Sequence, residues 1–154
     1  LGVYQTYTDE VFEAVDSIND EYGDGDWQPV HVFYENNYAQ GIAGMCLYDV
    51  LFVNPVIDGM NLVSKEGPLV NERDGVLVLS ELAGSYEQLS EYALGVPPTD
   101  LEGTVRALRS ALTMPPDERR RRAAALKRLI QEEDITFWLE RQLRDLLAVT
   151  KGAL

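Results

Sequence analysis

The sequence predicts an α/β fold in which a parallel sheet carries helices on both faces. Strand-like segments alternate along the chain with helical patterns, and these segments are continuously apolar instead of alternating between apolar and polar residues. Continuous apolar strands are buried on both faces, which is typical of parallel sheets. A length of 154 residues with 45% hydrophobic residues is enough to form a core.

The first part of the chain predicts two helices and one strand. Apolar residues recur at helical spacing over residues 8–22, and Thr8 is expected to cap this helix. A glycine- and aspartate-rich turn ends it. A short apolar strand is expected at 30–34, followed by a helix at 36–48 that two glycines weaken.

The remaining elements alternate more regularly. A cap at Thr99 or Asp100 precedes one helix, and Pro116 opens the next. The run Arg119–Arg122 opens that same helix and is expected to be solvated. The strands are predicted at 49–56, 76–80 and 93–96, and the helices within 57–70 after a turn, within 81–89, and at 101–114, 116–133 and 135–149.

The charge excludes several classes of partner. The net charge is −13, and the first 64 residues hold 11 of the 26 acidic residues and none of the 13 Lys and Arg. We therefore expect neither a nucleic acid nor an anionic membrane as a partner. No apolar run approaches the roughly 18–20 residues of a membrane span. The single cysteine and the lack of a visible signal peptide predict a cytoplasmic protein.

Two strand-to-helix turns are candidate sites, because ligands of open α/β sheets bind beyond the carboxyl ends of the strands. In the first, Gly59 permits close approach of the backbone, and the N–H groups that follow it suit a phosphate. Asp58 would project into the crevice. Glu66, expected two helical turns further on, suits a ribose diol. The alternative is that Asp58 merely caps the helix and Glu66 is a surface residue.

The second turn follows the strand at 76–80. Its small residues Ser80, Ala83 and Gly84 would allow a ligand or another backbone segment to approach. This pattern alone is a weak signal. Without further information, the two turns are separate candidates.

Longer motifs make the sequence resemble the trehalose-6-phosphate synthase family over about residues 8–149. The motifs are DWQPVHVFY, DVLFVNPVIDGMNLVSKE, DGVLVLSELAGSYEQL and a later ALTM-PP-ER…D-I-x-x-W. This family comprises retaining glycosyltransferases with two Rossmann-like domains, the GT-B arrangement. The resemblance implies that residues 1–132 are part of a Rossmann-like domain for the nucleotide-sugar donor. Residues 133–154 would form a helix that crosses back to an absent N-terminal acceptor domain.

The resemblance also implies roles for individual residues. Asp58 would accept hydrogen bonds from donor-sugar hydroxyls, and Glu66 would bind the ribose hydroxyls. The backbone at Gly59, Met60, Asn61, Leu62 and Val63 would hold the sugar and the diphosphate, and the Ser80–Gly84 turn would line the cleft. No catalytic residue is assigned within the chain. The substrates would be a UDP- or GDP-linked sugar and a sugar phosphate, with no cofactor and no metal.

Departures from the family pattern leave two alternatives open. Ile57 stands where the family usually has Arg, and Gly67-Pro68 follow Glu66 where an aromatic residue is usual. These changes are compatible with a pseudo-glycosyltransferase that couples a nucleotide-linked cyclitol to an amino-cyclitol phosphate. The family's diphosphate-clamping Arg and Lys would lie upstream of this chain. A catalytically silent fragment or interaction module is therefore the other alternative.

Overall fold

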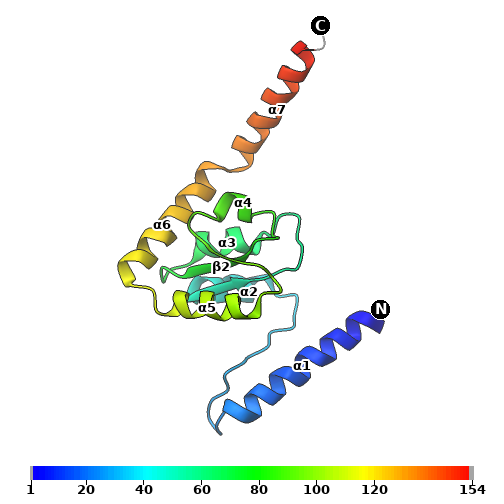
Figure 1. Cartoon of the computed structure of the whole chain (residues 1–154), viewed down its shortest axis with the longest axis vertical. Coiled ribbons are helices and arrows are strands. Elements are labelled where there is room, and N and C mark those ends of the chain that lie inside the picture. Colours follow the sequence, from blue (N-terminus) through cyan, green and yellow to red (C-terminus); the bar gives the residue numbers. More distant parts are fainter. Residues whose placement is uncertain (1, 153–154) are drawn as a thin grey trace. The chain divides into compact units, whose positions relative to one another are not determined.

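The computed structural model describes residues 2–152. The chain divides after Asn37 into two compact units. The first contains α1 (Gly2–Tyr22) and the segment 23–37. In chain order the second contains α2 (Tyr38–Leu47), β1 (Val50–Val53), α3 (Val63–Val70), β2 (Val76–Ser80), α4 (Tyr86–Leu89), β3 (Leu94–Val96), α5 (Leu101–Leu112), α6 (Pro116–Glu132) and α7 (Ile135–Gly152), as Figure 1 shows.

The helix of the first unit begins earlier than predicted. α1 starts at Gly2, so the expected N-cap at Thr8 is wrong. The Thr8 hydroxyl lies inside the helix and donates to the Tyr4 carbonyl at 2.9 Å, the bond that a threonine makes within a helix. The helix ends at Tyr22, immediately before the glycine-rich turn, as predicted.

The strand predicted at 30–34 is absent from this structure. A strand needs a neighbouring strand, and here the backbone of Val30 is bonded to a side chain instead. The Asn19 amide donates to the Val30 carbonyl at 3.0 Å, and its oxygen accepts from the Val30 N–H at 2.9 Å. The rings of Phe12 and Tyr34 also meet edge to face, with 5.9 Å between centroids. Local contacts therefore replace the predicted pairing.

The second unit confirms the predicted parallel α/β fold. Its sheet has the order β1-β2-β3, and both pairings are parallel. Phe52 of β1 is in register with Val78 of β2, and Leu79 of β2 with Gly95 of β3. All five residues of β2 are buried, as expected for the central strand of a sheet that is covered on both faces.

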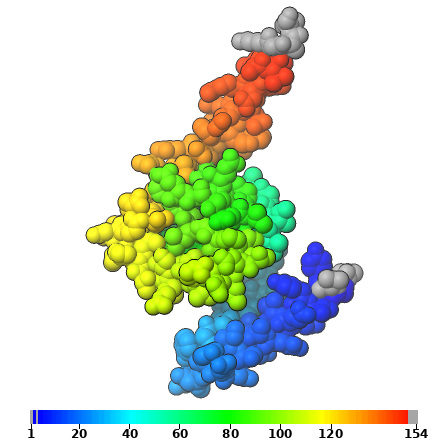
Figure 2. Space-filling model, viewed as in Figure 1, coloured from blue at the N-terminus to red at the C-terminus, as the bar shows by residue number. Residues whose placement is uncertain are grey.

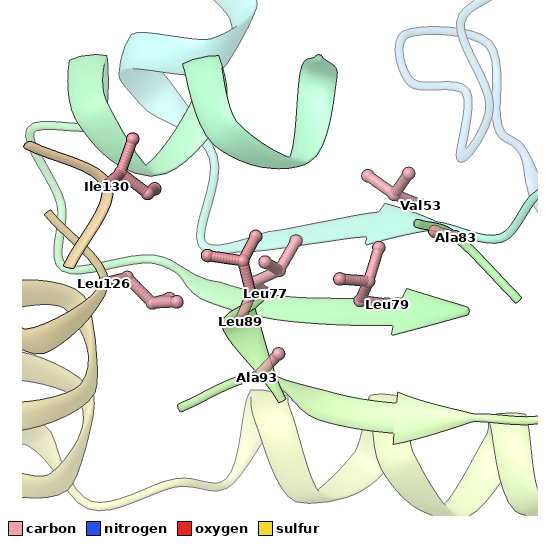
Figure 3. Packing of buried hydrophobic residues seen from close by; sticks show 8 residues of the cluster. All are labelled: Val53, Leu77, Leu79, Ala83, Leu89, Ala93, Leu126 and Ile130. Carbon is pink, nitrogen blue, oxygen red and sulfur yellow. The ribbon is translucent and has the colours of Figure 1, made fainter. Parts of the chain in front are cut away.

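Alternate residues of β2 serve two separate hydrophobic clusters. Leu77 and Leu79 pack with Leu126 and Ile130 of α6 on one face, as Figure 3 shows. Val76 and Val78 pack on the other face in a cluster with Ala111 of α5. In Figure 2, segments coloured green to yellow form much of the visible surface of this unit, with teal segments beside them and the orange-to-red α7 beyond. No helix within residues 2–152 is both long and apolar enough to cross a membrane.

Two predicted helix starts are confirmed, and the arginine run is corrected. The carboxylate of Asp100 accepts the Gly103 N–H at 2.9 Å and caps α5, and Pro116 begins α6. Arg119 and Arg122 are only 23% and 21% exposed, so the expectation of a solvated run holds for the other two arginines alone. Both half-buried guanidinium groups donate to backbone carbonyls of neighbouring segments.

Glu118 makes the stability of the fold sensitive to acid. Hydrogen bonds from Arg121 and Arg122, at 2.7–2.8 Å, lower the pKa of Glu118 from 4.5 to about 2. A folded-state pKa below the unfolded value gives stability that is present above the unfolded pKa and lost as the pH falls through the folded one. We therefore expect the stability difference between the unmodified chain and Glu118→Gln to shrink as the pH falls from about 4.5 towards about 2.

Urea unfolding at a series of pH values would measure this difference. Glu102→Gln is a suitable control, because Glu102 is 90% exposed and lies 3.5 Å from Arg106 on an open helix face. Exposed pairs of this kind contribute little to stability. A difference between the unmodified chain and Glu118→Gln that stays constant over that pH range would contradict the prediction.

Candidate functional site

The structure brings the two predicted turns together. The turn after β1 and the turn after β2 form an isolated parallel bridge between Asp58 and Ala83. The Asp58 N–H donates to the Leu82 carbonyl at 3.3 Å, and the Gly84 N–H donates to the Asp58 carbonyl at 2.9 Å. The two turns are therefore one structure at the carboxyl edge of the sheet, where ligands of α/β folds bind.

The Asp58 carboxylate is held by its own turn. One oxygen accepts the Met60 N–H at 3.0 Å, and the other accepts the side-chain amide of Asn61 at 3.1 Å. These hydrogen bonds hold the pKa of Asp58 below its usual 3.8. Each carboxylate oxygen has a second lone pair, so Asp58 keeps acceptor capacity for hydroxyl groups.

Asn61 caps the helix that follows. Its backbone has a positive φ of 69°, a conformation that asparagine tolerates better than most residues. Its side-chain oxygen accepts the Ser64 N–H at 2.9 Å, at the start of α3. The alternative that Asp58 caps this helix is therefore wrong, because the N–H in the first turn of α3 is accepted by the Asn61 side chain, while the Asp58 carboxylate accepts the Met60 N–H before the helix begins.

Backbone donors are available in the same loop. Among the described residues, no hydrogen bond uses the N–H groups of Gly59, Leu62 or Val63. An added Cβ at Gly59 would meet nothing within 4 Å, so the space beside this residue is open. Free N–H groups at the first turn of a helix favour an anion, such as a phosphate. The side chains of Met60 and Leu62 are exposed beside these donors.

Glu66 lies closer to the loop than expected. It stands in the first turn of α3, which begins at Val63, and not two helical turns beyond Asp58. The reason is that residues 57–62 form a loop instead of the start of the helix. Glu66 is half-buried, and within the described part of the chain no hydrogen bond or ion pair occupies its carboxylate, which leaves it able to accept hydrogen bonds.

The three residues predicted in the second turn differ in exposure. Ser80 and Ala83 are buried, and the Ser80 hydroxyl accepts the Leu82 N–H at 3.1 Å, so these two shape the turn from inside. Gly84 is exposed and lies against the first turn: a Cβ there would overlap the Gly59 carbonyl oxygen and come within 2.7 Å of its carbon. A glycine is required there by the close approach of two backbones.

Sequence reasoning missed two serines that join the turns. Ser64 and Ser85 are both buried, and their hydroxyl oxygens are 2.7 Å apart. The Ser85 N–H also donates to the Met60 carbonyl at 2.9 Å. No local signal predicts this pair, because the residues are far apart in sequence and each belongs to a different candidate turn. The available hint was the family resemblance, which implies that the Ser80–Gly84 turn lines the same cleft as the Asp58 loop.

A largely apolar cleft of about 880 Å³ adjoins this loop. Met60, Leu62 and Lys65 line it on the loop side, and Gln88 and Trp138 are among its other lining residues. Asp58 of the loop and Glu66 of α3 are not in its lining, so their carboxylates do not belong to this cleft. Residues 2–152 contain no group of three or more His, Cys, Asp or Glu arranged to hold a metal ion.

Comparison with known proteins places the chain in a family context. The family model described as "Glycosyltransferase family 20" matches residues 2–148. A protein from Salmonella paratyphi B named trehalose-6-phosphate synthase is 37% identical over 153 residues, which cover 97% of this chain and 32% of that protein.

Solved structures are similar over the same extent. A structure titled "Trehalose-6-phosphate from E. coli bound with UDP-2-fluoro glucose" superposes with a TM-score of 0.83 and 35% identity, covering 94% of this chain and 32% of the other. A UDP-forming α,α-trehalose-phosphate synthase from Burkholderia xenovorans, in complex with glucose-6-phosphate, gives 0.82 and 34%, covering 96% and 33%. The chain thus spans about one third of the length of these proteins.

Proposed function

Since the chain belongs to glycosyltransferase family 20, we propose that it is the donor-binding part of a retaining glycosyltransferase. The complete protein transfers glucose from a nucleoside diphosphate glucose to glucose 6-phosphate and releases α,α-trehalose 6-phosphate. Support comes from the names of its relatives and from the ligands that two similar structures carry, a UDP-sugar analogue and glucose-6-phosphate.

The observation that carries this proposal is the pairing of an acceptor and donors in one loop. The Asp58 carboxylate accepts hydrogen bonds from the sugar hydroxyls. The free N–H groups of Gly59, Leu62 and Val63 donate hydrogen bonds to the diphosphate of the sugar nucleotide. Glu66 in the first turn of α3 accepts the ribose diol. Fixed N–H dipoles also stabilise the charge that develops on a departing diphosphate, a contribution that requires no protein nucleophile.

The rest of the donor domain and an acceptor domain complete the protein in this proposal. Residues 1–132 form part of the donor domain, and the outer edge of β1 is free for a further strand, because β1 pairs with β2 alone among the described residues. Residues 133–154 cross back to the acceptor domain. Exposed apolar side chains along α7, such as Trp138, Leu143 and Leu146, support a covering partner there.

Turnover by the complete protein tests the proposal. UDP-glucose and GDP-glucose would each be supplied with glucose 6-phosphate, and the disaccharide phosphate would be identified by NMR, which also gives its anomeric configuration. We expect trehalose 6-phosphate with both glycosidic centres in the α configuration. A complete protein that folds but forms no such product from either donor would refute the assignment.

Ile57 favours one second candidate. Its side chain is 85% exposed next to Asp58, so the loop presents an apolar group where the family resemblance implies an arginine. A pseudo-glycosyltransferase that joins a nucleotide-linked cyclitol to an amino-cyclitol phosphate would need less positive charge there. The assay above separates the two, because robust formation of trehalose 6-phosphate eliminates this candidate.

The isolated chain is expected to be inactive and to bind the donor weakly. It presents one loop of the site, without the diphosphate-clamping cations that the family resemblance places upstream. Titration of residues 1–154 with UDP-glucose, followed by calorimetry or NMR, should give a Kd weaker than about 1 mM. Tighter binding would show that this loop alone supplies most of the donor affinity.

A further inference from the structure

The buried serine pair has a defined direction of hydrogen bonding. The Ser64 hydroxyl donates its single proton to the Asn61 carbonyl at 2.8 Å. Its contact of 2.7 Å with the Ser85 hydroxyl must therefore use the Ser85 proton. The pair thus forms a chain of donors that runs from the second turn to the backbone of Asn61.

Asn61 connects the serine pair to Asp58 through hydrogen bonds. Ser64 holds Asn61 twice, through its hydroxyl on the carbonyl and through its N–H on the side-chain oxygen. With its oxygen fixed in this way, the Asn61 amide nitrogen points at the Asp58 carboxylate, 3.1 Å away. The positive φ of Asn61 is a conformation that costs free energy unless neighbouring bonds hold it.

We propose that Ser85 and Ser64 are positioning residues that fix the Asp58 carboxylate towards the donor sugar through Asn61. This inference rests on the proposed function, because it takes Asp58 as the group that accepts the sugar hydroxyls. Neither serine touches the donor in this scheme: both are buried, with 2% or less of their surface exposed. Their role is to keep the loop in one conformation before the donor arrives.

Amide hydrogen exchange in the 154-residue chain tests the structural half. Ser64→Ala and Ser85→Ala should each speed exchange of the backbone amides at positions 60 and 64 about fivefold to tenfold, the loss expected for one hydrogen bond. Ser90→Ala is the matched control, because Ser90 is an exposed serine at the end of α4. Unchanged exchange at both amides in Ser64→Ala would overturn the proposal.

The double variant separates positioning from packing. Ser64→Ala alone leaves the Ser85 hydroxyl buried without its acceptor, whereas replacing both serines removes the whole pair and should restore most of the lost thermal stability. The loop amides should nevertheless keep their faster exchange, because the Asn61 carbonyl has lost the hydroxyl that held it and only the N–H of residue 64 still bonds the Asn61 side chain. Return of both quantities to the values of the unmodified chain would mean that the serines matter for packing alone.

Donor analogues test the functional half in the complete protein. The preference of the enzyme for UDP-glucose over a deoxy analogue is the ratio of their kcat/KM values. For the analogue that lacks the hydroxyl bonded to Asp58, this ratio should fall about tenfold in Ser64→Ala. An equal loss on every donor would overturn the positioning role. If the unmodified protein uses no nucleoside diphosphate glucose, the proposed function fails. The exchange experiment still decides whether the two serines hold the Asp58 loop in place.

Discussion

Asp58→Ala in the complete protein is expected to lower kcat/KM for the nucleoside diphosphate glucose about tenfold to a hundredfold. The physical reason is that hydrogen bonds to a charged group contribute roughly 1.5–3 kcal/mol, which corresponds to such a factor. Steady-state kinetics with varied donor and saturating glucose 6-phosphate would measure the loss. Asp58→Asn is a useful companion, because it keeps an oxygen for the Met60 N–H and removes the charge.

Two controls give this result its meaning. Glu72→Ala removes an exposed carboxylate beyond the C-terminal end of α3 and should leave the kinetics unchanged. The loss in Asp58→Ala should also be the same at about pH 5 and at about pH 8, because the lowered pKa keeps Asp58 ionised across this range. Unaltered donor kinetics in Asp58→Ala would remove Asp58, and with it the proposed donor loop, from the mechanism.

The elements that the sequence predicted correctly are those whose signals are local or strongly apolar. β2 lies at its predicted residues 76–80, because a continuous apolar run bounded by turns suits a strand buried on both faces. The cap of α5 at Asp100 and the start of α6 at Pro116 depend on local chemistry, and both are confirmed. The strand at 30–34 failed, because a short apolar run becomes a strand when a partner strand pairs with it, and none of the described residues do so.

The site was predictable only where its residues give a local sequence signal. Asp58 and the Gly59 turn could be placed from the strand-turn-helix pattern, and the structure puts them at the expected edge of the sheet. The contact between the two turns depends on tertiary packing, which a single sequence does not display. The function of Asn61 as a cap was visible in principle, since an asparagine three residues before Ser64 is a capping pattern.

Gly84→Ala is expected to destabilise the second unit by about 2–3 kcal/mol, at the upper end of the usual cost of overpacking. The added methyl group would overlap the carbonyl of Gly59, and backbone cannot move aside as a flexible side chain does. The two turns would have to separate, which breaks the bonds from Gly84 and Ser85 to Asp58 and Met60. Urea unfolding of the 154-residue chain would measure the change, and a loss below about 0.5 kcal/mol would contradict it.

Gly59→Ala is the counterpart of Gly84→Ala, because it should change donor affinity and leave stability unchanged. The methyl group at Gly59 would enter open space and the backbone has no positive φ there, so the free energy of unfolding should change by no more than about 0.5 kcal/mol. Donor affinity of the complete protein should nevertheless fall about tenfold, because that open space is where the sugar diphosphate is proposed to approach the backbone. A variant with unchanged stability and unchanged donor affinity would show that the donor binds elsewhere. The reason is that a methyl group at Gly59 would block a ligand beside the backbone without disturbing the fold.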